Sequence, residues 1–169
     1  MRIHFPLLVV ICVICFLNCK DKPPETVAIP TYIPKNSAQS VVYDASKIFT
    51  IEEKKALTNK IMAYEKETTN EIGVLTIDSA PFDMHILDFG TEVSNAWGIG
   101  KKDKNNGLLI TFAKKDKSIA IAVGLGTEAI ISDANCKIII DSVMIPKFKE
   151  NRFYEGIDRA IDSLIVLWD

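Results

Sequence analysis

Hydrophobic residues recur at the spacing of an amphipathic helix over residues 51–68. Leu57, Ile61 and Tyr64 fall on one face of that helix. Thr50 and Glu53 stand three positions apart at its start, which is the spacing of a capping box. The pattern predicts a helix that begins after Thr50 and buries one apolar face.

Three short, continuous apolar runs have the length of buried strands. They cover residues 72–77, 108–113 and 119–123. The polar segment 114–117 separates the last two runs and predicts an antiparallel hairpin. A helical pattern separates the first two runs, so a right-handed crossover is expected to make those two strands parallel.

Three further helices are expected around these strands. Asp83 is predicted to cap a helix that ends at Gly98, and Asp133 to cap a helix that stops at Pro146. The last helix is expected over residues 154–167, with an apolar stripe along one side. This order of elements predicts an α/β fold, a three-layer α/β/α sandwich built on a small mixed β-sheet.

The N-terminus carries a different pattern. An apolar run over residues 5–17 ends at Cys19, and this predicts a lipoprotein-type signal peptide over residues 1–18 with Cys19 lipidated. Residues 19–40 are rich in proline and polar side chains and are expected to be a tether, followed by the domain at 41–169. An ordinary cleaved signal and an uncleaved anchor are the alternatives, although the run is short for a membrane span.

Composition and charge narrow the classes of function. The net charge of −2 at pH 7 gives no basic surface for nucleic acid, and two histidines argue against a His-rich metal site. Cys136 is the only cysteine after Cys19, so no internal disulfide is expected and Cys136 should be a small buried residue. We expect an exported lipoprotein of the bacterial cell envelope, in the periplasm or on the outer surface, held to the membrane by the lipid on Cys19.

Polar residues gather before the second predicted strand and after the third. Because these two strands are antiparallel, both segments should lie at one edge of the sheet, near the start of the helix after Ser132. Carboxylate, amide and carbonyl oxygens without His or Cys favour calcium, and magnesium second. The predicted metal ligands are Asp103, Asn105, Asn106, Glu128 and Asp133.

Other interpretations of these residues stay open. Asn106 precedes a glycine, as in many turns, and Asp133 is a good helix cap without any metal. Asp44 and Asp78 form an alternative metal site at the opposite edge of the sheet, where ligands often bind in α/β proteins. Asp44 could instead fix the approach to helix 51–68.

Eight short motifs carry a resemblance to a known family: Val42-Tyr43-Asp44, Ile72 to Asp78, Trp97 to Gly100, Asn105 to Ile110, Val123 to Glu128, Ser132-Asp133, Pro146-x-Phe148 and Tyr154 to Ile157. Their order and spacing over about residues 41–167 resemble the TPM domain. That family includes bacterial envelope proteins and a thylakoid-lumen protein linked to photosystem II repair. The resemblance implies an α/β/α sandwich, with calcium binding in some members and acid phosphatase activity reported for some.

Two functions follow from the residues and the resemblance together. The first is a cell-envelope lipoprotein whose cation-bound domain supports assembly or maintenance of membrane protein complexes, through an unidentified envelope partner. The second is a metal-assisted acid phosphatase for small phosphate esters or phosphoproteins, with Asp103 and Asp133 as ligands and Glu128 as base. Lys101, Lys102 and Lys104 are the basic side chains near these acids, and no P-loop is present. The first function is preferred, and whether the protein is an enzyme stays open.

Overall fold

The computed structural model describes residues 29–169. The predicted signal peptide, Cys19 and the first part of the tether lie outside the described residues. The sheet has four strands in the order β1 (Val42–Asp44), β2 (Glu71–Ile77), β3 (Gly107–Ala113) and β4 (Ser118–Val123). β1, β2 and β3 are parallel, and β4 is antiparallel to β3. The predicted parallel pair and hairpin are confirmed, and β1 is an addition that the sequence did not predict.

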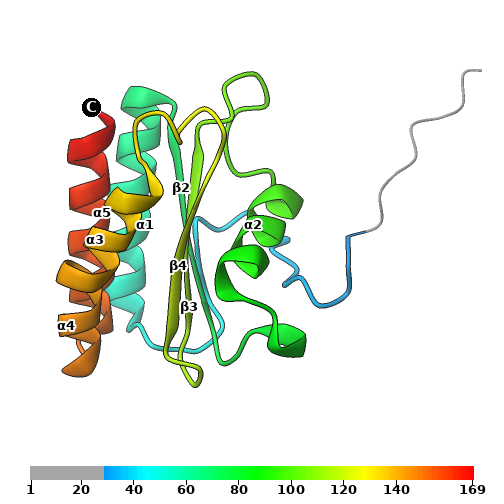
Figure 1. Cartoon of the computed structure of the whole chain (residues 1–169), viewed down its shortest axis with the longest axis vertical. Helices are drawn as coiled ribbons and strands as arrows, with labels where there is room; N and C mark the ends of the chain where they lie inside the picture. Colours follow the sequence, from blue (N-terminus) through cyan, green and yellow to red (C-terminus); the bar gives the residue numbers. More distant parts are fainter. Residues whose placement is uncertain (1–28) are drawn as a thin grey trace, which may run out of the picture.

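Helices cover both faces of the sheet (Figure 1). One face carries α1, α5 and a three-part helical segment made of α3, η2 and α4, and the other face carries α2. The α/β/α sandwich expected from the sequence is therefore confirmed. The helical bounds are α1 Ile51–Thr68, η1 Pro81–Asp83, α2 Ile86–Trp97, α3 Asp133–Ile139, η2 Ile140–Met144, α4 Ile145–Lys149 and α5 Phe153–Trp168.

The sheet separates two hydrophobic cores because successive strand side chains point to opposite faces. Val74 and Ile110 belong to the core beneath α1 and α5, whereas Leu75 and Leu109 belong to the core beneath α2. All four side chains are fully buried. This explains why the strands appear as continuous apolar runs, since each strand is covered on both faces.

Two helix starts differ from the sequence prediction by one or two residues. α2 is capped by His85, whose Nδ1 accepts a hydrogen bond from the Leu87 amide at 3.4 Å, because Asp83 lies in the short helix η1. α3 is capped by Ser132, whose Oγ accepts from the Asn135 amide at 3.3 Å. Asp133 is therefore the first helical residue instead of the cap.

The predicted stop at Pro146 is wrong, because the helical segment continues to Lys149. Proline cannot donate the hydrogen bond that an uninterrupted α-helix needs at that position. The segment passes through the π-helical turn η2 and resumes with Pro146 in the first turn of α4, where its missing N–H costs nothing.

The described part of the predicted tether packs on the domain. Ile33 is buried in the core beneath α2, and the Trp97 Nε1 donates to the Pro34 carbonyl at 2.8 Å. Tyr32 donates a hydrogen bond to Glu92 of α2. Residues 32–34 thus belong to the folded body, whereas the sequence suggested a domain that begins near Val41.

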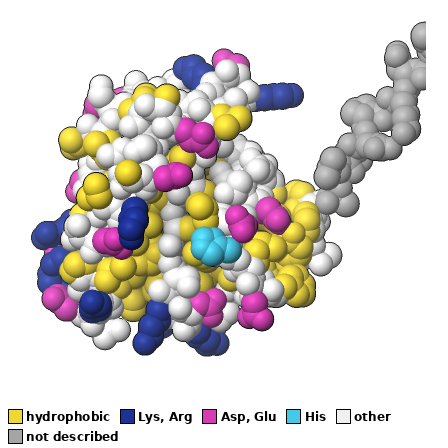
Figure 2. Space-filling view, viewed as in Figure 1, with side chains coloured by type: hydrophobic (Ala, Val, Ile, Leu, Met, Phe, Trp, Pro, Cys, Tyr) yellow, Lys and Arg dark blue, Asp and Glu magenta, His cyan; other side chains and the backbone are white. Residues whose placement is uncertain are grey.

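The surface carries mixed charges. On the face shown in Figure 2, acidic and basic side chains are interspersed and apolar side chains lie between them. Among residues 29–169, none of the helices is long and apolar enough to span a membrane. Large apolar side chains still reach the surface at several places, among them Ile51, Phe82, Leu125 and Val166.

Candidate functional site

Two loops meet at the amino end of β2 and β3, above the sheet in Figure 1. The Gly126 amide donates to the Asn105 carbonyl at 3.1 Å, and the Gly124 amide donates to the Gly107 carbonyl at 2.8 Å. A Cβ on Gly126 would stand only 1.9 Å from the Lys104 carbonyl oxygen. Glycine at position 126 therefore permits the contact that brings the segment before β3 against the segment after β4.

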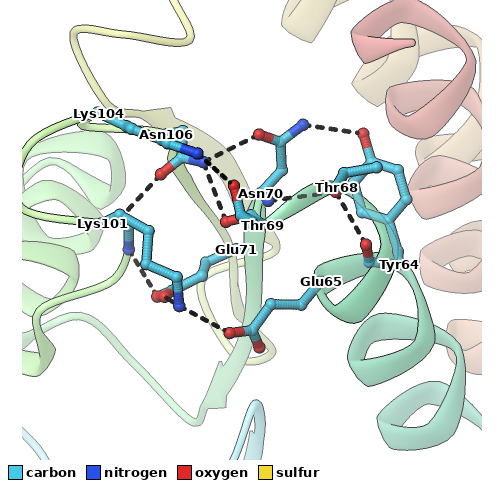
Figure 3. Close-up of polar contacts among 10 residues, drawn as sticks. Tyr64, Glu65, Thr68, Thr69, Asn70, Glu71, Lys101, Lys104 and Asn106 are labelled. Carbon is cyan, nitrogen blue, oxygen red and sulfur yellow. Dashed lines mark hydrogen bonds and ion pairs between the residues drawn. The ribbon is translucent and has the colours of Figure 1, made fainter.

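Asn106 fastens this edge to the start of β2 (Figure 3). Its Oδ1 accepts from the Lys101 amide at 2.9 Å, and its Nδ2 donates to the Thr69 carbonyl and to Asn70 Oδ1, both at 3.0 Å. The residue is only 7% exposed. A buried amide with this many protein partners positions the loop, and it is poorly placed to ligate a metal.

Lys101 forms a second link across the same edge. Its ammonium lies between Glu65 of α1, at 2.9 Å, and Glu71 of β2 (Figure 3). The Glu71 carboxylate also accepts from the Gly100 amide at 2.8 Å. Hydrogen bonds and charge from the two glutamates raise the pKa of Lys101 above its usual range.

The three predicted acidic ligands are all exposed. Asp103 lies in the loop before β3, Glu128 in the loop after β4, and Asp133 in the first turn of α3. No carboxylate of the three forms a hydrogen bond or an ion pair with another residue of the described range 29–169. Asn105 is also exposed, and its backbone is left-handed with φ of 48°.

The structure brings the two predicted segments together without closing a metal cluster. Within residues 29–169, no three Asp, Glu, His or Cys side chains are grouped closely enough to hold an ion. Thr127, next to Glu128, is fully buried, and its hydroxyl has no described hydrogen-bond partner. The metal assignment to these residues remains a prediction.

The acids at the carboxyl end of the sheet have protein partners. Asp44 accepts hydrogen bonds from the Ile48 and Phe49 amides at 3.1 Å each, and from the Thr76 hydroxyl. Asp78 forms an ion pair with Lys115 at 2.8 Å, and this lysine lowers the pKa of the Asp78 carboxyl. Asp44 thus fixes the approach to α1, as one of the two sequence interpretations proposed.

Nucleophilic chemistry has little support in the described residues. Cys136 is 6% exposed, and burial raises the pKa of its thiol to about 11, so the thiol is protonated at neutral pH. His85 is exposed and caps α2. The exposed oxygen-bearing side chains at the amino end remain the best-placed chemical groups.

Sequence analysis missed the network that supports this edge. Thr69, Asn70 and Glu71 fall between the predicted helix 51–68 and the predicted strand 72–77, and Lys101 was named only as a basic side chain near the acids. Each residue gains its role from a partner about 30 or more positions away, such as the Asn106–Thr69 pair separated by 37 positions. No local pattern could have identified these pairs.

A family model described as the TPM domain matches residues 42–167. Solved structures with the same fold include the N-terminal domain of a P. gingivalis protein, with a TM-score of 0.70 and 23% identity over 78% of this chain and 83% of that one. A protein of the psychrophilic bacterium Bizionia argentinensis gives a TM-score of 0.63 and 24% identity over 75% of this chain and 89% of that one. The N-terminal domain of a Corynebacterium glutamicum protein gives a TM-score of 0.59 and 16% identity over 82% of this chain and 88% of that one. No curated protein matches the chain.

Proposed function

Because this chain belongs to the TPM domain family, we propose that its domain binds a divalent cation at the amino end of the sheet, with calcium preferred over magnesium. One observation carries the proposal. Asp103, Glu128 and Asp133 are exposed carboxylates without a described partner, and they lie on segments that converge at one edge. Exposed carboxylates on converging segments are the oxygen ligands that a hard cation prefers.

The kind of oxygen available favours calcium. Calcium accepts six to eight oxygens from carboxylates, amides and backbone carbonyls in irregular geometry, whereas magnesium requires a near-ideal octahedron. The side chains of Asp103, Asn105, Glu128 and Asp133 would supply ligands. Asn106 is assigned a different role, because its amide already holds the loop to Thr69 and Asn70.

The cellular role rests on the predicted anchor. We propose that lipid on Cys19 holds the domain at a bacterial envelope membrane, where the cation-bound form supports assembly or maintenance of membrane protein complexes. In a bacterial host, wild-type protein should sediment with the membrane fraction and the Cys19→Ser variant should not. A Cys19→Ser variant that stays in the membrane fraction would refute the lipid anchor.

Calorimetric titration of the full chain in detergent with calcium chloride tests the cation site. Binding should be saturable, and Asp103→Asn or Glu128→Gln should weaken it about tenfold or more, because affinity depends on the number of charged ligands. Glu52→Gln is the matched control, since Glu52 is an exposed acid at the start of α1. The calcium affinity of the Glu52→Gln variant should stay within about twofold of that of the wild type.

Two results would contradict the proposal. Absence of binding heat at millimolar calcium would mean that the domain does not bind this cation and functions without it. Retained binding in the Asp103→Asn and Glu128→Gln variants, with loss in Asp44→Asn, would move the site to the carboxyl end of the sheet.

Phosphatase activity is the alternative, and the described contacts give it less support. Lys101 is engaged by Glu65 and Glu71, and Lys104 Nζ donates to the Thr69 hydroxyl at 2.8 Å. Lys101 and Lys104 are therefore engaged within the protein, which leaves Lys102 as the only one of the three candidate lysines without a partner among residues 29–169. Turnover of para-nitrophenyl phosphate that disappears in Asp103→Asn and Asp133→Asn, with the fold intact, would establish the enzyme and reverse the preference.

A further inference from the structure

A groove of about 980 Å³ lies beside the start of β2, apart from the proposed cation site. One wall is the segment that leads into β1, including Pro30, Pro34 and Ser37, and the other includes Trp97 and Ile99 at the end of α2. Ile72 and Gly73 of β2 also line it, and Glu65 and Glu71 mark one end. The groove therefore ends against the backbone of the first residues of β2.

That stretch of backbone lacks a neighbouring strand. β2 pairs with β3 along its whole length, from Glu71 to Ile77, but β1 covers only Val74 to Thr76. Strand residues alternate in the direction of their backbone groups, so the side facing β1 carries the amides and carbonyls of Val74, Thr76 and Ile72. The Val74 amide donates to the Val41 carbonyl at 2.8 Å, and the Thr76 carbonyl accepts from the Ala45 amide at 2.9 Å.

Ile72 is the residue on this side of β2 whose backbone groups are not paired with β1. Neither its N–H nor its C=O has a hydrogen-bond partner among residues 29–169, although the residue is only 2% exposed. Buried backbone groups without partners are rare and costly in folded proteins. The segment that leads into β1 does not supply the missing pair, because it turns at Gln39, whose φ is 48°, and the Gln39 and Ser40 amides donate to Asn36 instead.

We propose that this groove binds an extended peptide segment of a partner protein, which adds to the sheet beside β2 and pairs with Ile72. Strand addition satisfies exposed main-chain groups with main-chain hydrogen bonds, and flanking pockets select side chains. A residue other than proline must stand opposite Ile72. The Trp97 and Ile99 wall fits an apolar side chain next to it.

The charges at the end of the groove specify the peptide further. Glu65 and Glu71 share a single described ion-pair partner, Lys101. Two carboxylates against one ammonium leave a negative charge around Glu65 and Glu71, and Lys35 is the other charged residue that lines the groove. A lysine or arginine in the peptide complements it, so the ligand is a basic, apolar, extended segment. This inference does not depend on the cation proposal.

Fluorescence anisotropy of the full chain in detergent tests the groove with defined probes. The basic probe is a labelled, capped peptide that alternates valine and threonine between two terminal lysines. A second probe replaces the central valine by proline, and a third replaces both lysines by glutamate. Loss of one to two main-chain hydrogen bonds should weaken the proline probe about three- to tenfold or more. The glutamate probe should bind more weakly than the basic probe.

Two neighbouring substitutions separate the groove from the surface around it. Ser37 is exposed and lines the groove, whereas Ala38 is exposed and does not line it. Ser37→Phe should fill the groove and weaken the basic probe about fivefold or more, and Ala38→Phe should leave it within about twofold. Hydrogen exchange should slow at the Ile72 amide when the basic probe binds to the wild-type chain.

Several outcomes would overturn the proposal. Failure of the basic probe to bind at millimolar concentration would do so, as would equal weakening by Ser37→Phe and Ala38→Phe. An Ile72 amide that is already protected in the free chain, with residues 20–28 protected as well, would identify the chain's own N-terminal segment as the occupant. Protection that grows with protein concentration would identify a second copy.

Discussion

The acids considered as metal ligands at the two ends of the sheet differ in whether the fold already binds them. At the carboxyl end, Asp44 accepts hydrogen bonds from Ile48, Phe49 and Thr76, and Asp78 pairs with Lys115. At the amino end, the carboxylates of Asp103, Glu128 and Asp133 have no hydrogen-bond or ion-pair partner in the described range. The fold therefore uses Asp44 and Asp78 at the carboxyl end. At the amino end it uses Glu65 and Glu71, which pair with Lys101, and leaves Asp103, Glu128 and Asp133 available.

A neutral amide makes this difference possible. Asn106 joins the starts of β2 and β3, as Asp44 joins the ends of β1 and β2. Since Asn106 and the Lys101 link to Glu65 and Glu71 hold the amino end, the loop carboxylates of Asp103, Glu128 and Asp133 are not needed for the fold. The difference indicates that acids become candidates for ligand binding where another side chain already does the structural work.

The largest expected effect comes from removing that amide. Asn106→Ala removes a buried side chain and leaves the Lys101 amide, the Thr69 carbonyl and Asn70 Oδ1 without their partner in a part-buried network. Each unsatisfied buried group costs about 1–3 kcal/mol, so we expect a loss of about 2–4 kcal/mol in the free energy of unfolding. Urea denaturation followed by circular dichroism measures it.

Asn95→Ala is the matched control for this change. Asn95 is an exposed residue in α2 whose side chain has no hydrogen bond to another residue in the described range, so its loss should alter stability by less than about 0.5 kcal/mol. Equal losses in the two variants would show that Asn106 does not hold the amino end, and the comparison between the two ends would fail.

The next effect comes from the structural acid at the other end. Asp44→Asn keeps the size of the side chain but removes the charge and one accepting oxygen, so the Ile48 or Phe49 amide loses its partner. We expect a cost of about 1–2 kcal/mol, since charge-assisted hydrogen bonds are stronger than neutral ones. Asp103→Asn, measured the same way without calcium, should leave the unfolding midpoint unchanged. Destabilisation by Asp103→Asn would assign that acid to the fold.

Periodicity in the sequence was enough to predict most of the fold. α1, α5 and the strands β2, β3 and β4 were located from apolar spacing, because each has a long or fully buried hydrophobic pattern. β1 has three residues, which is too few for an alternating pattern to be recognised. The continuation past Pro146 depends on a π-helical turn, and no local signal distinguishes it from a helix end.

The candidate site was only partly predictable. The antiparallel hairpin correctly indicated that the segments before β3 and after β4 share one edge. The sequence could not separate Asn106 from Asn105, because both precede a strand and carry the same side chain. Only the folded chain brings Thr69 and Asn70 to Asn106 and leaves Asn105 in solvent.

The smallest expected effect is a shift in the pKa of Asp78. The Lys115 ammonium lowers this pKa, so replacing it by Lys115→Met should raise the pKa of Asp78 toward its ordinary value. Carboxyl chemical shifts followed by NMR from neutral pH into the acid range measure the change. Lys102→Met is the control at the opposite end and should leave the Asp78 titration unaltered.

The sign of the pH dependence follows from the same contact. A carboxyl whose pKa is lower in the folded chain stabilises the fold above its unfolded pKa, and this contribution disappears as the pH falls through the folded value. The ion pair is exposed to solvent, so added salt should shrink the shift. An unchanged Asp78 pKa in the Lys115→Met variant would mean that Lys115 does not form an effective ion pair with Asp78. Asp78 would then be as available as Asp103, and the contrast between the two ends of the sheet would rest on Asp44 alone.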